Sequence, residues 1–386
     1  MRLDIIQYKY NYGLPSQWII EEFKLSTINL IVGKNASGKS RIIKAIYLVA
    51  QLLSEGGTLK PNQRKDEWHL FFDIDNSEQK TEYILKLNNG SVVEEKLIIG
   101  NRTVLDRDES GEGTILAEQL KTNMRFETNK TEIAVFKRRD SIQHPFLENI
   151  YEWSNSLRFY EFGTELGKNI IALIPPTIEL LKSKTDTKDS DYVVGIFVLG
   201  KQELASAFTD EIIKDMKAIG YNISDIGTKV PSRIYPSIDL SENQDNLPQF
   251  LYVQEEDLIS VTEQSEMSQG MFRTLSLFIQ VNYSLISHQP SCIIIDDIGE
   301  GLDYQRSSSL IEILIEKAQT GLVQLIMTSN DEFIMNGVPL EYWSVIERKS
   351  GEAKIHNIFN SPDKIEQFKF IGLNNFDFFT SEFALS

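Results

Sequence analysis

The sequence has little cysteine, no excess of basic residues and no long apolar run, and each absence excludes a class of protein. Its one cysteine, Cys292, cannot form an internal disulfide, which fits a reducing cytosol. No apolar stretch approaches the roughly 20 residues that cross a bilayer, and the N-terminus MRLDIIQYKYNYG lacks a signal-peptide pattern. A net charge of −17 excludes a uniformly basic nucleic-acid surface, but it leaves room for a local basic groove. We expect a cytoplasmic protein with no membrane partner.

The first part of the chain alternates between strand and helix patterns. An apolar run at Thr27–Val32 predicts a strand, and apolar residues at helical spacing predict a helix from about Ser40 to Leu53. Residues 66–140 hold several strand-like runs separated by polar turns, with Asn89-Gly90 as a hairpin turn. These patterns predict a β-rich region that follows a strand–helix unit.

The second part begins with a less regular stretch. We predict a helical region over 145–184, a strand over 191–200 and a helix over 203–219. Two apolar strands, Cys292–Ile295 and Leu322–Met327, then flank a helix. Strand–helix–strand alternation of this kind is typical of a mostly parallel sheet with crossover helices.

The strongest chemical motif is GKNASGKS, between the first apolar strand and its helix. It matches G-x-x-x-x-G-K-[ST], the phosphate-binding loop (P-loop), in the strand and helix context that the motif requires. The glycines let backbone N–H groups point at phosphate oxygens, and the start of the helix adds its dipole. Lys39 would neutralise the β- and γ-phosphates, and the Ser40 hydroxyl would ligate Mg²⁺. The predicted nucleotide-binding residues are Gly33, Lys34, Asn35, Ala36, Ser37, Gly38, Lys39, Ser40 and Arg41.

Two adjacent carboxylates, Asp296 and Asp297, follow the strand Cys292–Ile295. A carboxylate at the carboxyl end of a parallel strand lies at the crevice where such sheets bind ligands. We predict that Asp296 holds Mg²⁺ and that Asp297 orients or polarises the attacking water. The alternative is that one or both aspartates cap the turn that follows.

The order GKNASGKS, SQG, IIIDDIGEGLD and TSND resembles the nucleotide-binding head of ABC-type ATPases. More narrowly, it is similar to the soluble branch that holds the SMC, RecF-type and OLD-type ATPases. The resemblance implies an α/β P-loop NTPase fold, an ABC-type head with an antiparallel β-subdomain and a helical insertion. It covers about 1–55 and 260–335 well. The chain lacks the sustained heptads of true SMC arms.

The resemblance also implies roles for residues beyond the P-loop. Ser268 and Gly270 would contact the γ-phosphate held by a second subunit, and Asp303 would lie at the dimer seam. Ser268 could instead be a plain helix N-cap. Asn330 stands at the family's switch position, with a helix cap as the alternative reading. Gln143 is the candidate for the Gln loop and its metal contact.

The resemblance implies a domain organisation as well. We expect a first ATPase lobe with the P-loop and β-subdomain at 1–144, and an insertion of helices and mixed structure at 145–255. A second ATPase lobe would span 256–360, and an aromatic tail would span 361–386.

The implied function is an ATPase that uses ATP and Mg²⁺, forms a homodimer or higher homo-oligomer around ATP, and signals to a separate effector. The resemblance to stand-alone OLD-like heads suggests anti-phage defence with a nuclease or toxin as that effector. Asp297 stands where the family usually has Glu, so we expect slow hydrolysis. A RecF-like DNA-repair ATPase, which the net charge disfavours, and a nucleotide-locked scaffold with little turnover are the alternatives.

Overall fold

A computed structural model describes residues 1–74, 80–230, 247–287, 291–321, 323–371 and 373–381. The chain divides into two compact units. Unit 1 consists of Met1–Leu157, Gln324–Asn330 and Val338–Ser386, and unit 2 consists of Arg158–Val323 and Asp331–Gly337. The four-part division expected from the sequence stays a prediction.

Unit 1 contains most of the strands. Its elements are β1 (Arg2–Tyr10), β2 (Trp18–Lys24), β3 (Ile28–Val32), α1 (Lys39–Glu55), β4 (Lys65–Asp73), β5 (Thr81–Asn88), β6 (Ser91–Ile99), β7 (Arg102–Arg107), β8 (Glu112–Ala117), β9 (Thr122–Glu127), α2 (Ala134–Lys137), α3 (Phe146–Ser156), β16 (Val323–Thr328), the short helix η1 (Leu340–Tyr342), β17 (Trp343–Lys349), β18 (Glu352–Asn357), α9 (Pro362–Ile371) and α10 (Asn375–Thr380).

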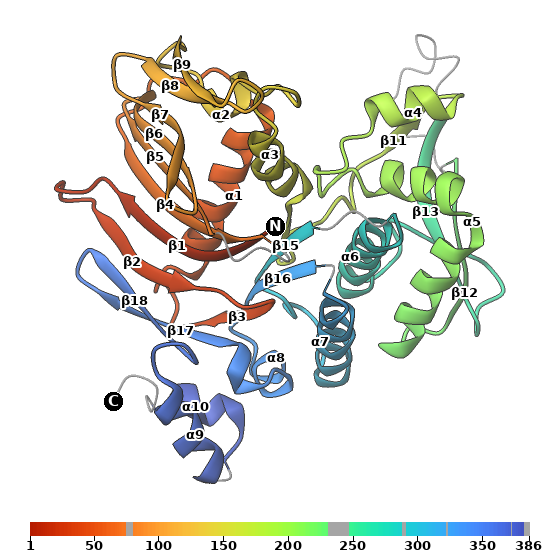
Figure 1. Ribbon diagram of the computed structural model, residues 1–386. Coiled ribbons are helices and arrows are strands. Elements are labelled where there is room, and N and C mark those ends of the chain that lie inside the picture. Colours follow the sequence, from red (N-terminus) through yellow and green to blue (C-terminus); the bar gives the residue numbers. More distant parts are fainter. Residues whose placement is uncertain (75–79, 231–246, 288–290, 322, 372, 382–386) are drawn as a thin grey trace. The chain divides into compact units, whose positions relative to one another are not determined.

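The strands of unit 1 form one continuous sheet in the order β16-β3-β17-β18-β2-β1-β4-β5-β6-β7-β8-β9. The strand β3 pairs in parallel with β16 and β17, whereas β4 to β9 are antiparallel and lie beside α1 and α3 (Figure 1). The hairpin predicted at Asn89-Gly90 is confirmed, because both residues have positive φ angles of 51° and 73° between β5 and β6. The antiparallel β-subdomain is therefore present.

The helix α1 follows the P-loop and anchors it in the core of unit 1. Its buried side chains recur at helical spacing, as the sequence predicted, and α1 packs against α3. Trp68 of β4 is buried and donates its indole N–H to the carbonyl of Ala45, 3.0 Å away. The helix is thus fixed to the β-subdomain as well as to the strand before it.

A fully buried ion pair crosses the β-subdomain. Glu95 of β6 and Arg107 of β7 have no exposed side-chain surface, and Nη1 of Arg107 lies 3.3 Å from Oε2 of Glu95. Glu95 also accepts hydrogen bonds from the backbone N–H groups of Ala134 and Val135, each at 2.8 Å. Burial raises the pKa of Glu95, while these N–H groups and Arg107 oppose that rise. The pair fixes the segment before α3 onto the sheet.

Replacing Arg107 with methionine should destabilise unit 1 strongly. The change leaves Glu95 buried without its cation and frees three backbone carbonyls of the 128–132 segment that Arg107 now satisfies. Breaking a buried pair in this way costs about 3–5 kcal/mol. Urea unfolding should show a markedly lower midpoint. The matched control is Arg125→Ala, which removes an exposed pair with Glu112 and should change the midpoint little. Equal midpoints for the two variants would contradict the role assigned to Arg107.

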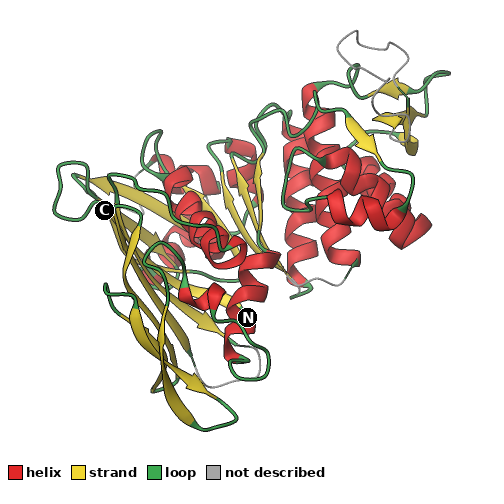
Figure 2. Ribbon diagram, turned by 90° about the horizontal axis from the view of Figure 1, so that it is seen from above, coloured by secondary structure: helices red, strands yellow, loops and turns green. Residues whose placement is uncertain are grey.

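Unit 2 contains the remaining elements. They are β10 (Arg158–Glu161), β11 (Ala172–Ile174), α4 (Ile178–Lys184), α5 (Val193–Ala218), β12 (Ile223–Lys229), β13 (Leu247–Glu255), β14 (Thr262–Glu263), α6 (Gln269–Ile286), β15 (Ser291–Asp296), α7 (Tyr304–Gln319) and α8 (Glu332–Gly337). Figure 2 shows the helices of this unit side by side, with short strands gathered at one end. Among those strands, β13 pairs antiparallel with β11, β12 and β14.

Two expectations for this part of the chain are wrong. The region 145–184 is not helical throughout, because β10 and β11 lie within it. The stretch 191–200 is not a strand but the first half of α5, in which only Ala205 has a non-helical φ of 51°. The apolar residues of that first half are buried, and α5 packs against α6. Tertiary packing therefore overrides the β-propensity of its Val and Ile residues.

The aromatic tail folds back onto unit 1. Phe378 of α10 packs edge-on against Trp343 and Phe368, with ring centroids 6.2 and 5.0 Å apart. Residues 372 and 382–386 of the tail, and Leu322 of the second predicted strand, lie outside the described part of the chain. Among the residues that the structure describes, no helix is long and apolar enough to cross a membrane.

Candidate functional site

The P-loop lies in unit 1 between β3 and α1. All five residues of β3 are buried, and α1 begins at Lys39 with Gly38 as its N-cap at a φ of 112°. Gly33 is required by close packing, since a Cβ there would overlap Ile346 and lie 2.6 Å from Oγ of Ser37. Ala36 also has a positive φ, of 61°, at the outer bend of the loop. The loop therefore has the curled backbone that directs N–H groups inward.

The side chains of the loop fit a phosphate group. Nζ of Lys39 donates to the carbonyl of Gly33, 2.9 Å away, so the lysine side chain spans the loop from its last residues to its first. Oγ of Ser37 is buried and has no hydrogen-bond partner in the described structure. A buried hydroxyl without a partner is costly unless a ligand satisfies it. Lys34, Asn35 and Ala36 are exposed on the outer side of the loop.

Two supporting residues of the P-loop were not predicted. The indole of Trp18 lies under Gly38, where an added Cβ would come within 2.9 Å of it. Arg348, at the end of β17, donates to the carbonyl of Ala36 at 2.9 Å. Both reach the loop through strand pairing over long sequence separations, and no local pattern marks them.

The predicted metal-binding aspartate lies in unit 2 at the end of β15. Cys292 to Ile295 are buried, and Asp296 is only 6% exposed. The neighbouring strand β10 runs parallel, with Glu161 opposite Asp296, and the N–H of Phe162 donates to the Asp296 carbonyl at 2.9 Å. Asp296 thus stands at the carboxyl edge of a parallel pair, as the sequence predicted. Glu161 ends at the same edge and was not predicted.

Asp297 is the first residue of the turn that follows β15. It has a left-handed backbone with a φ of 52°, and its carbonyl accepts from the N–H of Glu300 at 3.3 Å. Gly299 and Gly301 also have positive φ angles, of 91° and 84°. A non-glycine residue in this conformation stores strain of the kind found at functional sites.

The signature residues Ser268 and Gly270 form the start of α6. Ser268 is the N-cap, and its Oγ accepts from the N–H of Met271 at 3.2 Å. A Cβ on Gly270 would lie 2.9 Å from Leu302 and 3.1 Å from the carbonyl of Gly301. The structure therefore brings the signature together with the loop after β15. Capping and phosphate contact are compatible, since both use the same helix start.

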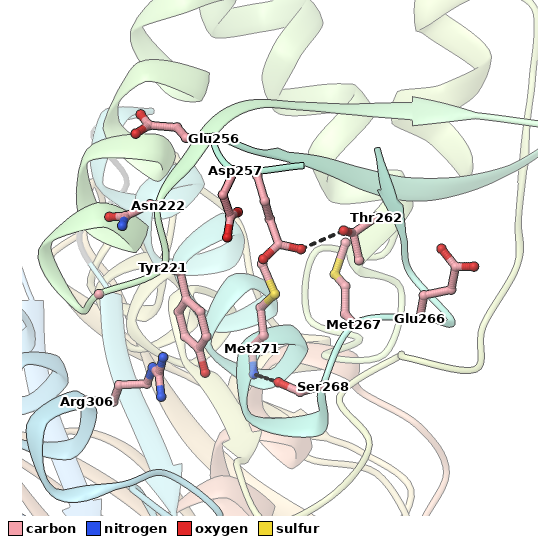
Figure 3. A pocket seen from close by; sticks show the side chains of 12 residues that line it. Tyr221, Asn222, Glu256, Asp257, Thr262, Glu266, Met267, Ser268, Met271 and Arg306 are labelled. Atoms are coloured by element: carbon pink, nitrogen blue, oxygen red, sulfur yellow. Dashed lines mark hydrogen bonds between the residues drawn. The ribbon is translucent and has the colours of Figure 1, made fainter. Parts of the chain in front are cut away.

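A pocket of about 540 Å³ opens beside Ser268 (Figure 3). Tyr221, Met271 and Arg306 line it together with Ser268, and burial raises the pKa of Tyr221. Four carboxylates also line it, those of Glu255, Glu256, Asp257 and Glu266. The negative charge of this lining disfavours a free anion in the pocket.

Arg273 connects three segments of unit 2 and was not predicted. Its guanidinium donates to the carbonyls of Gly163, Thr164 and Glu300 at 2.7, 2.6 and 3.1 Å. The segment 163–164 follows β10, and Glu300 lies in the turn after Asp297. Arg273 therefore ties the signature helix to both loops at the carboxyl edge of β10 and β15.

Asp303, the residue expected at a dimer seam, is the N-cap of α7. Its carboxylate accepts from the N–H of Arg306 at 3.0 Å and pairs with the guanidinium of the same residue. The N–H groups of the helix start and the guanidinium lower the pKa of Asp303. Its side chain remains about half exposed, so a partner can still reach it.

The two remaining predicted residues lie in unit 1. Asn330 is exposed after β16, and the side-chain cap of α8 comes from Asp331, which accepts from the N–H of Ile334 at 2.9 Å. Gln143 lies in the turn between α2 and α3, and its Oε1 is buried without a hydrogen-bond partner in the described structure. The roles of Asn330 and Gln143 stay predictions.

Comparison with known proteins identifies the family. The family model described as "AAA domain, putative AbiEii toxin, Type IV TA system" matches residues 28–336. The chain belongs to this AAA family. The matched range contains the P-loop, the signature, Asp296, Asp297 and Asn330. A search of curated proteins finds no match.

Three solved structures of SMC heads are similar to this AAA-family chain. An SMC head bound to the C-winged helix domain of ScpA matches with a TM-score of 0.51 at 13% identity, covering 92% of this chain and 97% of that one. The SMC head domain from Thermotoga maritima has a TM-score of 0.43 at 14% identity, covering 92% and 98%. An SMC head with an extended coiled coil, bound to a ScpA domain and derived from Pyrococcus furiosus, has 0.48 at 11%, covering 95% and 99%. The first match confirms the expected ABC-type P-loop fold.

Proposed function

We propose that this protein hydrolyses ATP and that two copies dimerise around the nucleotide. The P-loop is the observation that carries the proposal. The side chain of Lys39 spans the loop and donates to the carbonyl of Gly33, and the buried hydroxyl of Ser37 has no hydrogen-bond partner in the described part of the protein. Membership of an ATPase family supports the same conclusion.

The chain's own residues divide the chemistry between them. Backbone N–H groups of the P-loop bind the phosphates, and Lys39 neutralises the charge that develops on them. Ser40 and Asp296 are the residues that would hold Mg²⁺, which supplies further positive charge at the phosphate oxygens. Asp297 orients the attacking water, and Asn330 donates a hydrogen bond to the γ-phosphate or that water. Gln143 is the proposed Gln-loop contact to the metal.

The second half of the site is proposed to come from the other copy. Ser268 and Gly270 would offer N–H groups of the α6 start to the γ-phosphate, with Asp303 at the seam. The carboxylates beside Ser268 favour this arrangement over binding of free nucleotide. They repel an unneutralised anion, whereas a phosphate presented by a second copy would have its charge reduced by Lys39 and by the Mg²⁺ that Ser40 and Asp296 would hold.

The output is proposed to be a change in the assembly that a separate effector protein senses. We propose that the protein acts in anti-phage defence with a toxin or nuclease as effector. The family description names a putative toxin and a Type IV TA system, which supports only the link to a toxin. The net charge of −17 favours this reading over a DNA-repair function. We expect slow hydrolysis, so that the ATP-bound dimer persists as the signal.

Light scattering with and without ATP and Mg²⁺ tests the dimer. Wild-type protein should shift from monomer to dimer on ATP addition. Ser268→Arg should stay monomeric yet bind ATP normally, because the bulky side chain obstructs the signature and leaves the P-loop intact. Ser206→Arg, an exposed position on α5, is the matched control and should dimerise like wild type. A Ser268→Arg variant that dimerises with ATP would refute the trans contact.

A further inference from the structure

Unit 1 carries an aromatic platform beside the P-loop, formed by Tyr10 and Trp18. The guanidinium of Arg41 lies over both rings, with its Cζ 4.6 Å from the centroid of Tyr10 and 4.9 Å from that of Trp18. Tyr10 and Trp18 are directly opposite each other on β1 and β2. Their rings therefore come from the same face of the sheet, and together they hold one planar cation.

The platform is fixed relative to the P-loop. Trp18 is 2% exposed and packs against Gly38 from below. Tyr8 packs edge-on against Trp18, with centroids 6.2 Å apart, and its hydroxyl donates to Asp66 at 2.6 Å. Because the rings cannot move freely, the guanidinium of Arg41 is held in a defined place at the first turn of α1.

Arg41 itself is open to a ligand. It follows Ser40 directly, its side chain is exposed, and no hydrogen bond or ion pair with another side chain engages it in the part of the chain that the structure describes. A guanidinium that rests on aromatic rings presents a flat surface, and such a surface stacks on a nucleobase. A lysine here would offer a point charge without that plane.

We propose that Arg41, held on the platform, stacks on the purine base of the nucleotide whose phosphates the P-loop binds. This inference rests on the proposed function and adds base recognition to it. It assigns Tyr10 and Trp18 as positioning residues and predicts that the site discriminates ATP from tripolyphosphate, which shares the phosphates but lacks the base.

Calorimetric titration of the full chain with ATP and with tripolyphosphate, both with Mg²⁺, tests the inference. Arg41→Ala should raise the Kd for ATP about tenfold, the value expected for loss of one stacking contact. The Kd for tripolyphosphate should stay unchanged. Arg41→Lys, which keeps the charge, should lose most of the same ATP affinity because it lacks the planar face. Thermal unfolding of both variants should stay cooperative, with a midpoint only slightly below that of wild type because the contacts with the two rings are weakened.

The other outcomes separate the two proposals. If Arg41→Ala weakens ATP and tripolyphosphate equally, Arg41 contacts phosphate and the base assignment is wrong, while the P-loop assignment stands. If neither affinity changes, the base assignment is wrong as well. If the wild type binds neither ATP nor tripolyphosphate, the proposed ATPase function is wrong, and the base assignment falls with it. A change of tryptophan emission on addition of ATP but not of tripolyphosphate, absent in Arg41→Ala, would support the stack independently of affinity.

Discussion

Lys39→Ala should lose nucleotide binding almost completely, with a Kd for ATP at least about a hundredfold above that of wild type. The ammonium group of Lys39 lies against the Gly33 carbonyl, inside the curl of the P-loop. Removing it leaves the β- and γ-phosphates without their nearest cation, and the hydrogen bonds that it makes to charged oxygens are among the strongest in such sites. Calorimetric titration with ATP and Mg²⁺ measures the effect.

The control for this loss is Lys44→Ala. Lys44 is exposed on the same helix, and its replacement should leave ATP affinity near the wild-type value. Urea unfolding of both variants without nucleotide should show that each is folded. Retention of full ATP affinity by Lys39→Ala would overturn the assignment of the P-loop and everything built on it.

Asp297→Asn should bind ATP like wild type but hydrolyse it about 100- to 1,000-fold more slowly, because an amide cannot accept the proton of the attacking water. Asn has nearly the same shape and tolerates the left-handed backbone seen at this position, so the turn should survive. Phosphate release measures turnover. The same variant should accumulate as an ATP-bound dimer in light scattering.

The matched control is Asp210→Asn, an exposed carboxylate on α5 away from the signature pocket, which should keep wild-type turnover. Asp297→Ala is a poorer test, since alanine at a φ of 52° adds backbone strain to the loss of the carboxylate. If Asp297→Asn hydrolyses ATP at the wild-type rate, Asp297 takes no part in the reaction and serves only to shape the turn after β15. Absence of measurable hydrolysis in the wild type itself would favour the nucleotide-locked scaffold.

The backbone at Asp297 favours Asp over the Glu that the resemblance to ABC-type heads leads us to expect. Among residues other than glycine, Asn and Asp accept a positive φ most readily, because their short polar side chains bond to nearby backbone. A longer carboxylate would reach further but would adopt this turn less easily. The slow turnover that we propose would then be a consequence of the local backbone.

Sequence patterns predicted the parts of the site that are encoded locally. The P-loop, α1, the strand before Asp296 and the Asn89-Gly90 turn all depend on residues within a few positions of one another. Glycine spacing, buried runs and turn chemistry act at that range, so these predictions needed no knowledge of the fold.

Predictions failed where the structure of a segment depends on contacts with residues far away in the sequence. The first half of α5 was assigned to a strand because its apolar residues suit either structure until α6 covers them. Arg273 and Arg348 act through backbone carbonyls, which carry no sequence signal. The platform of Tyr10 and Trp18 depends on the pairing of β1 with β2. Residues of this kind become visible only once the sheet order is known.

The position of β3 in its sheet has a consequence for synthesis of the protein. This strand leads into the P-loop near the N-terminus, yet it pairs with β16 and β17, which are translated about 290 residues later. At ordinary elongation rates the interval is on the order of tens of seconds. The nascent chain therefore cannot complete the strand pairs around its nucleotide loop until most of unit 2 has emerged from the ribosome. A prematurely terminated product would lack both neighbours of β3, so an incomplete chain should not reach the ATP-bound state that is proposed to signal.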